Sequence, residues 1–152
     1  MASRVREISF DVQGMVAGTI VLTAAGALPV EYLSAADRIV TRSGLRALRG
    51  VTVTVLRRAA LVRIGVDTLG IGQPAAEVVV SAGQQVMIRD WRAQTMFGAA
   101  QALIPARLLV DGHWIRAEAK TDVRLFALEF ETRDVVYAGG LELGCAPQRV
   151  TA

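Results

Sequence analysis

The chain has very little cysteine, histidine and lysine, and these shortages exclude several kinds of protein. Among its 152 residues there is one cysteine, Cys145, one histidine, His113, and one lysine, Lys120. A single cysteine excludes an intrachain disulfide, so stability does not depend on an oxidising compartment. One histidine and one cysteine make a poor metal site. We therefore expect no metal and no cofactor, and we interpret Cys145 as a bystander rather than a nucleophile.

Aromatic residues are also scarce, at 5%, although 53% of the residues are hydrophobic. The core must therefore be built mostly from valine, leucine, isoleucine and alanine, and this composition excludes a disordered chain. The length predicts one domain. Because no Ser/Gly linker, charge block or tandem repeat divides the chain, we expect a single domain over residues 1–152.

The formal net charge of +3 comes almost wholly from arginine. The arginines are spread along the chain, with acidic residues between the later ones. This distribution favours a solvated basic face over a nucleic-acid surface. We therefore expect no binding to nucleic acid. High arginine and alanine usage is typical of a GC-rich bacterial genome, and we expect a cytoplasmic bacterial protein.

One apolar run, residues 15–30, imitates an export signal because Arg4 and Arg6 precede it. Glu7 and Asp11 intervene, however, and threonines and glycines dilute the run. We interpret it as strand and turn, with an export signal as the alternative. No other run is long enough to span a membrane.

Most of the chain consists of short β-branched runs separated by turn residues, which predicts an all-β fold. Alternation is strictest at 51–55, where one face should be apolar and the other hydroxyl-bearing. In the first strand, Val5, Ile8 and Phe10 are the candidate buried positions. We expect strands at 5–12, 19–23, 38–42, 51–55, 61–66, 77–81, 85–89, 107–110, 123–131 and 134–137.

Two segments depart from the strand pattern. Residues spaced for one face of a short helix predict a helix over 93–103 that Pro105 ends: Met96, Phe97, Ala100 and Leu103. A smaller helical turn is expected within 30–36.

Three further features are interpreted structurally. The only histidine lies in the run 111–114, which is typical of an exposed turn between strands. Trp91 and Trp114 are interpreted as core or rim packing, with partner anchors as the alternative. Glu129 and Glu131 share one strand face, which we interpret as solvated rather than as an acid/base pair.

A series of landmarks follows in the first third of the chain. In order, these are Gly18-Thr19-Ile20, Gly26, Pro29-Val30-Glu31-Tyr32-Leu33, Asp37-Arg38-Ile39-Val40-Thr41 and Gly44. Their order and spacing resemble the opening of a Hint domain, the hedgehog/intein module, in its bacterial form. The resemblance implies a curved all-β fold with pseudo-two-fold symmetry and one or two short helices.

Family members of this pattern begin self-cleavage with a cysteine four residues before the glycine of the Gly-Thr pair. Its thiolate attacks the preceding carbonyl in an N-to-S acyl shift. Counting back from Gly18 leads to Gly14. The resemblance therefore implies that the nucleophile is missing, because glycine has no side chain.

The family's second block resembles Ser/Thr, two residues and then histidine, which polarises the amide and gives its nitrogen a proton. Here the block reads Ser81-Ala82-Gly83-Gln84, so Gln84 stands at the histidine position. Glutamine donates and accepts hydrogen bonds but shuttles no proton near neutral pH. Both groups that the family chemistry needs are thus substituted.

The resemblance continues through 90–116 and the closing strands at 123–141, and covers about residues 8–143. Ala127 and Arg133 occupy two places where relatives often carry histidines. Inteins resembling this module end in His-Asn before a nucleophile, because the asparagine amide cyclises to release the chain. Leu143 and Gly144 precede Cys145, so no cyclising amide is present.

We therefore expect a catalytically inactive Hint-like domain that acts as a structural or protein-interaction module with a protein partner. The former active-site cleft, around Gly14, Thr19, Ser81 and Gln84, is expected to persist as a small polar pocket. One alternative is a residual self-processing enzyme that uses Cys145 or the hydroxyl of Thr19 or Ser81. Another is a small subunit of a larger bacterial assembly.

Overall fold

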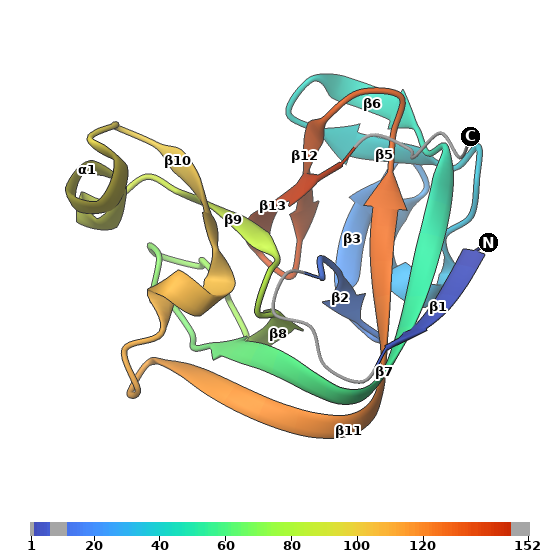
Figure 1. The fold of residues 1–152 in the computed structure, drawn as a ribbon. Helices are drawn as coiled ribbons and strands as arrows, with labels where there is room; N and C mark the ends of the chain where they lie inside the picture. Colours follow the sequence, from blue (N-terminus) through green and yellow to red (C-terminus); the bar gives the residue numbers. More distant parts are fainter. Residues whose placement is uncertain (1, 7–11, 147–152) are drawn as a thin grey trace.

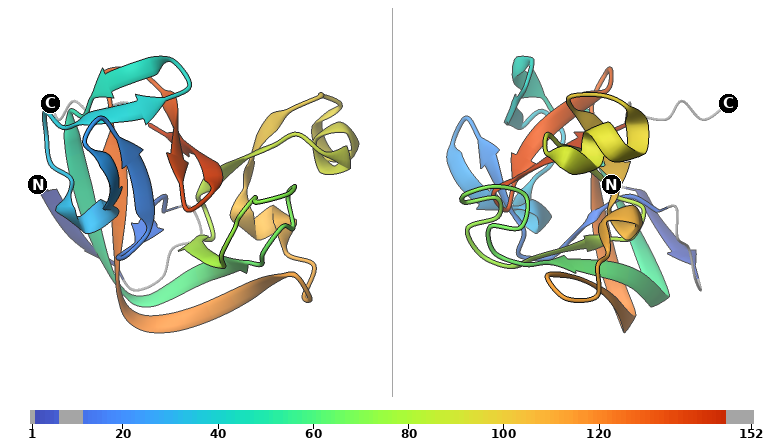
Figure 2. Two further views of the ribbon diagram at one scale, coloured as in Figure 1. Left: turned by 180° about the vertical axis from the view of Figure 1, so that it is seen from behind. Right: turned by 90° about the vertical axis from the view of Figure 1, so that its left-hand side faces the viewer.

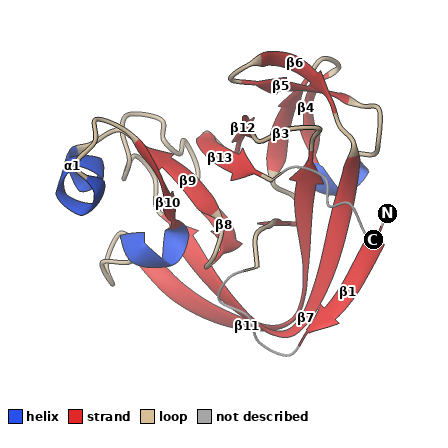
Figure 3. Cartoon of the chain, turned by 45° about the horizontal axis from the view of Figure 1, so that its top comes forward, coloured by secondary structure: helices blue, strands red, loops and turns tan. Residues whose placement is uncertain are grey.

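A computed structural model describes residues 2–6 and 12–146 of the chain, and within them β-strands predominate (Figures 1 and 3). This confirms the all-β prediction. The strands are β1 Ala2–Arg6, β2 Met15–Val16, β3 Ile20–Thr23, β4 Gly26–Pro29, β5 Arg38–Thr41, β6 Gly44–Ala47, β7 Gly50–Ile64, β8 Val78–Ser81, β9 Gln85–Ile88, β10 Ala102–Pro105, β11 Ile115–Glu129, β12 Asp134–Ala138 and β13 Leu141–Cys145. The helical segments are the α-helix α1 Trp91–Phe97 and the 3-10 turns η1 Val30–Tyr32 and η2 Ala106–Leu109.

The longest strands, β7 and β11, pair antiparallel along nearly their whole length, and bend as they run across the molecule (Figure 1). Val51 and Val53 at one end of β7 belong to the main core, as do Val62 and Ile64 at the other. Between them, Leu56, Ala59 and Leu61 enter a second, smaller cluster. The core-facing side of the ribbon therefore changes at the bend, where Asp122 of β11 takes a positive φ of 54°.

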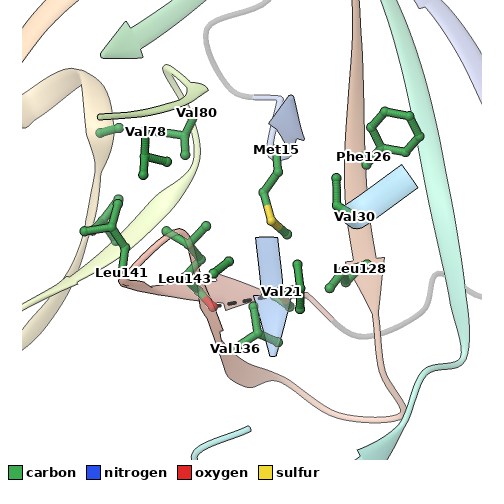
Figure 4. Packing of buried hydrophobic residues seen from close by; sticks show 14 of the residues in the cluster. Met15, Val21, Val30, Val78, Val80, Phe126, Leu128, Val136, Leu141 and Leu143 are labelled. Carbon is green, nitrogen blue, oxygen red and sulfur yellow. Dashed lines mark hydrogen bonds between the residues drawn. The ribbon is translucent and has the colours of Figure 1, made fainter. Parts of the chain in front are cut away.

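The strands form a five-stranded sheet, β1-β7-β11-β2-β8, and an eight-stranded sheet in which β9, β13, β12, β3 and β5 are successive neighbours. Figure 2 shows the two from behind and from the side. The main core joins the two sheets, with β2 contributing Met15, β3 Val21, β8 Val80, β12 Val136 and β13 Leu143 (Figure 4). Burying each such side chain contributes roughly 1.5–3 kcal/mol. This packing holds the start of β2 beside the turn between β8 and β9.

The strict alternation at 51–55 is confirmed in part. Val51 and Val53 are buried, as expected, but Thr54 on the other face is buried as well. The reason is the second cluster, which covers that face of the ribbon with Leu125 and Leu56.

The helix expected over 93–103 is wrong at both ends. It starts earlier because the Asp90 side chain accepts a hydrogen bond from the Arg92 amide and caps the first turn. It ends at Gly98, whose φ of 64° suits a left-handed C-cap. The residues beyond it form β10, paired antiparallel with β9.

The strand expected at 107–110 is also wrong, since these residues lie mostly in η2. The amides of Ala106 and Arg107 donate to the carbonyls of Gln84 and Ala82, both at 2.9 Å. Because these tertiary bonds turn the chain back onto the β8–β9 loop, the segment joins no ladder.

Other expected elements are found in full or in part, and one lies partly outside the described residues. The helical turn within 30–36 is η1, and the run 15–30 contains β2, β3 and β4, as a strand-and-turn interpretation requires. Of the expected strand at 5–12, residues 5–6 lie in β1, while Ile8 and Phe10 fall outside the described residues. Of the strands expected at 61–66 and 123–131, residues 61–64 lie in β7 and residues 123–129 in β11, and both strands end earlier than expected. The strands β6, β10 and β13 were not expected. Within the described part of the chain, no helix has the length and apolar character needed to cross a membrane.

Candidate functional site

The structure brings together Gly14 and Gln84, the two substituted positions of the sequence pattern. Gly14 immediately precedes β2, and Gln84 lies in the turn between β8 and β9. The Gly14 amide donates a hydrogen bond of 3.0 Å to Gln84 Oε1. Because only 2% of Gln84 is exposed, this contact lies inside the protein.

Two further hydrogen bonds fix the orientation of the Gln84 amide. Its Nε2 donates to the Gly144 carbonyl at 2.9 Å and to the Gln85 carbonyl at 3.0 Å. Since both partners are carbonyls, the nitrogen must point toward them and the oxygen toward the Gly14 amide. Gln84 therefore joins the start of β2 to the end of β13 and presents an acceptor, with no proton, to the nitrogen of residue 14.

Gly14 fits its position because it lacks a side chain. Its φ is +155°, and a Cβ built there would lie 2.9 Å from the Cβ of Leu125 and 3.3 Å from the amide nitrogen of Phe126. The first of these distances is shorter than real Cβ contacts, and a Cβ atom cannot rotate away. Any other residue at position 14 requires β2 and β11 to move apart.

Ser81 also contacts this segment. Its amide donates to the Gly14 carbonyl at 3.2 Å, and its Oγ donates to the Val12 carbonyl at 2.6 Å. The side chain is buried and its hydroxyl proton is engaged. Ser81 thus ties the residues before β2 to the end of β8.

Thr19, the fourth residue of the expected pocket, is bonded locally. Its Oγ1 donates to the Val16 carbonyl at 2.8 Å and closes the turn between β2 and β3. The structure therefore joins Gly14, Ser81 and Gln84 by hydrogen bonds, while Thr19 bonds to none of these three. All three of Thr19, Ser81 and Gln84 are buried.

Cys145 lies at the end of β13, with 7% of its surface exposed. Burial, with a smaller contribution from the charge of Asp134, raises the pKa of its thiol to about 12. Near neutral pH the thiol therefore stays protonated, and the thiolate is the nucleophilic form. Among the described residues no group of three metal-ligating side chains is found.

The other residues that the sequence singled out are not bonded to the buried centre, which consists of Gly14, Ser81 and Gln84. His113 is exposed in a turn, as expected, where Asp111 Oδ1 accepts the amides of residues 113, 114 and 115. Those backbone bonds lower the pKa of Asp111. Of the core or rim packing expected for the tryptophans, the core position is excluded, because Trp91 is 67% exposed and Trp114 is 63% exposed. Each is instead covered on one side by its chain neighbour, Trp91 by the Arg92 guanidinium and Trp114 by the His113 ring.

Glu129, the last residue of β11, and Glu131, just beyond it, differ in exposure. Glu129 is partly buried and accepts a hydrogen bond from Thr52 Oγ1. Glu131 lies beyond the end of β11 with a side chain that is 78% exposed, and pairs with Arg49 at 3.2 Å. Only Glu131 matches the solvated face expected from the sequence.

A cavity of about 320 Å³ opens next to the buried centre. Gln13, Gln85 and Gly144 line it, and each is the chain neighbour or hydrogen-bond partner of Gly14 or Gln84. None of Gly14, Thr19, Ser81 and Gln84 lines it. Sequence reasoning missed this cavity, because its walls come from segments far apart in the chain.

Comparison with known proteins places the chain in a family. The family model of the Hint domain matches residues 13–145. No curated protein matches the sequence. The bacterial intein-like domain from Clostridium thermocellum has a similar structure, with a TM-score of 0.63 at 13% identity over 89% of this chain and 99% of that one.

Two inteins are also similar in structure. The gp41-1 intein gives a TM-score of 0.57 at 13% identity, covering 87% of this chain and 98% of that chain. An N145AA form of the MchDnaB-1 intein gives 0.53 at 12% identity, covering 90% and 100%. At such identities these likenesses establish the fold alone. With the family model matched over most of its length, this chain belongs to the Hint domain family.

Proposed function

We propose that this Hint domain does not process itself and that it serves as a protein-interaction module. The hydrogen bond from the Gly14 amide to Gln84 Oε1 carries the proposal. Peptide cleavage before residue 14 needs a proton delivered to that nitrogen as it leaves. A carboxamide oxygen in this place accepts a hydrogen bond and has no proton to give.

The nucleophile is missing from the same place. Gly14 has no side chain. A Cβ built on it would lie 2.9 Å from the Cβ of Leu125, which leaves no room for a larger residue. A nucleophile must also be activated by a base or a lowered pKa. Neither half of the family reaction has a side chain to perform it.

Self-processing through another nucleophile finds little support in the geometry. The Ser81 and Thr19 hydroxyls donate to main-chain carbonyls, and neither is bonded to a group that would accept its proton as a base. The Cys145 thiol has a raised pKa. His113, the only histidine, lies in the exposed turn that Asp111 organises.

An interaction role is supported by the exposed apolar side chains of α1. Trp91, Met96 and Phe97 are each at least 44% exposed. Figure 1 shows α1 at the end of the molecule opposite the N- and C-terminal labels. Apolar surface of this kind is common where proteins contact partners. The same surface suits a small subunit of a larger assembly. Light scattering over a range of protein concentrations measures whether the chain associates with itself.

The test of the proposal is the mass of a fusion. The chain is placed between two stable reporter domains and incubated with and without dithiothreitol or hydroxylamine, with a self-processing Hint domain in the same fusion as positive control. The proposal predicts a single intact mass throughout. Fragments with a new end at the 13–14 bond, or around residues 144–146, would overturn it.

Matched variants identify the group responsible if fragments form. Ser81→Ala, Thr19→Val and Cys145→Ala each remove one candidate nucleophile. Fragments that disappear in only one of the three variants would assign a residual activity to that residue.

A further inference from the structure

The cavity beside the buried centre carries two cationic side chains. Arg42 follows β5 and Arg133 precedes β12. The Arg42 amide donates to the Val135 carbonyl at 3.0 Å, and Thr41 is paired with Val136, so the fold holds these two segments side by side. Two arginines that are distant in sequence thus line the same 320 Å³ space.

Neither guanidinium has an ion-pair or hydrogen-bond partner among the described residues. Arg42 and Arg133 are both exposed. Six other arginines pair with a carboxylate: Arg46, Arg49, Arg63, Arg89, Arg92 and Arg116. The donors at the cavity are therefore available to a ligand.

The one carboxylate in the cavity wall is already satisfied. Asp134 accepts hydrogen bonds from Thr41 Oγ1 at 3.0 Å, Ser43 Oγ at 3.3 Å and the Val135 amide at 2.8 Å. Its side chain is 5% exposed, and Arg46 lies 3.9 Å away. Asp134 therefore holds the β5–β12 wall together, and its recorded partners include neither Arg42 nor Arg133.

The remaining walls suit a peptide rather than a small inorganic anion. Leu103, Val135 and Ala146 are apolar residues of the lining, and Gln13 and Gln85 are its carboxamide residues. A volume of about 320 Å³ lies at the lower end of pockets that bind organic ligands. Arginine forks bind carboxylates through two parallel hydrogen bonds.

We propose that this cavity binds the carboxylate of a short peptide segment, with Arg42 and Arg133 as the donors. The inference rests on the proposed interaction function and names the chemistry of the partner. The carboxylate comes from an acidic side chain or from a chain end. The apolar wall takes a small side chain next to it.

Peptide titrations followed by amide NMR spectra test the site. The probes are acetyl-Ala-Asp-Ala-amide, the matched acetyl-Ala-Asn-Ala-amide and acetyl-Ala-Ala-Ala with a free carboxyl end. We expect the Asp peptide to shift the signals of Arg42, Val135 and Gly144, with the Asn peptide about tenfold weaker. Whether the free-end peptide matches the Asp peptide or the Asn peptide identifies the source of the carboxylate.

Charge-matched variants separate this site from general attraction to a basic protein. Arg42→Gln and Arg133→Gln should each weaken the preferred carboxylate peptide about tenfold. Arg57→Gln removes the same charge from an exposed position on β7 and should leave the affinity unchanged. Equal binding of the Asn peptide and both carboxylate peptides, no binding by any peptide, or equal loss in the Arg57 variant would overturn the proposal.

The mass measurement distinguishes this failure from that of the proposed function. An intact fusion that binds no carboxylate peptide overturns the cavity proposal alone. A fusion that cleaves itself overturns the non-processing proposal, whatever the titration shows.

Discussion

The buried centre and the open cavity are built from adjacent residues and have opposite properties. Gln84 and Gly14 lie inside, with their polar atoms bonded to the protein, while their neighbours Gln85 and Gln13 line the cavity. The hydrogen-bond partners of the Gln84 side chain are main-chain groups of the protein itself. In the cavity wall, the guanidinium groups of Arg42 and Arg133 have no ion-pair or hydrogen-bond partner among the described residues. Hydrogen-bond saturation thus distinguishes a structural polar site from one that can bind a ligand.

The difference also follows the direction of the chain. At the start of β9 the side chain of Gln84 is directed into the protein, where it reaches the Gly144 carbonyl, and Gln85 lies at the cavity. The end of β13 takes part in both, since the Gly144 carbonyl accepts the hydrogen bond from Gln84 and Gly144 and Cys145 also line the cavity. Changes at Gly14 or Gln84 should therefore cost stability, and changes at the exposed cavity residues Arg42 and Arg133 should cost binding.

The largest expected effect is that of Gln84→Leu. It leaves the Gly14 amide and the Gly144 carbonyl without their partner in a buried place, and each unsatisfied group costs about 1–3 kcal/mol. We expect the free energy of unfolding to fall by roughly 4 kcal/mol in urea titrations. Gln85→Leu is the matched control and should change it by less than about 1 kcal/mol. Equal losses of unfolding free energy in the two variants would contradict the difference between the buried centre and the cavity.

Gly14→Ala should have the next largest effect. The contact of its Cβ with Leu125 and the positive φ together should lower the free energy of unfolding by about 3 kcal/mol. Gly18→Ala is the control, because Gly18 also has a positive φ, +89°, but open space around it. Its loss should be about 1 kcal/mol, so a larger loss at position 14 is attributed mainly to the contact with Leu125.

Cys145 should make stability fall at high pH. Its pKa is about 12 in the folded protein against 9.0 as the ordinary value, so the unfolded chain loses the proton first. Between these two values the folded state binds more protons, and stability decreases as pH rises. From pH 9 to 10.5 the unmodified protein should lose about 2 kcal/mol more than Cys145→Ala.

The thiol reaction supplies an independent check on Cys145. A thiol reagent at pH 8 should modify the residue only at the rate of unfolding, because the thiolate is not formed in the folded state. Fast modification of the folded protein would contradict the burial of Cys145.

The smallest effect is expected for Ser81→Ala. The variant removes the hydrogen bond to the Val12 carbonyl and should cost about 1 kcal/mol. Thermal unfolding should show a correspondingly small decrease in Tm. A loss as large as that of Gln84→Leu would mean that Ser81 holds the segment before β2 as strongly as Gln84 does.

Much of this architecture could be predicted from the sequence, for a physical reason. Period-two alternation reports which strand faces are buried, and the glycine and Pro29 landmarks report turns. The family resemblance brought Gly14 and Gln84 to attention together, and the fold places them in contact. The interpretation of Cys145 as a bystander agrees with its burial.

The errors arose where tertiary contacts override local pattern. Residues 107–110 carry a strand-like run, yet the amides of Ala106 and Arg107 bond to the β8–β9 loop. Residues 102–105 pair with β9 instead of continuing α1. The exposed tryptophans and the arginine-lined cavity could not be predicted, because single-sequence patterns do not report which surfaces meet. Arg42 and Arg133 meet only through the pairing of β5 with β12.

Amide hydrogen exchange at Gly14, followed by NMR, tests the central claim most directly, because that claim rests on one hydrogen bond in a closed centre. The account predicts that the Gly14 amide exchanges only as fast as the whole protein unfolds, and that Gln84→Leu increases this rate together with the loss of stability. Exchange of the Gly14 amide in the unmodified protein at the rate of an exposed loop would contradict the account.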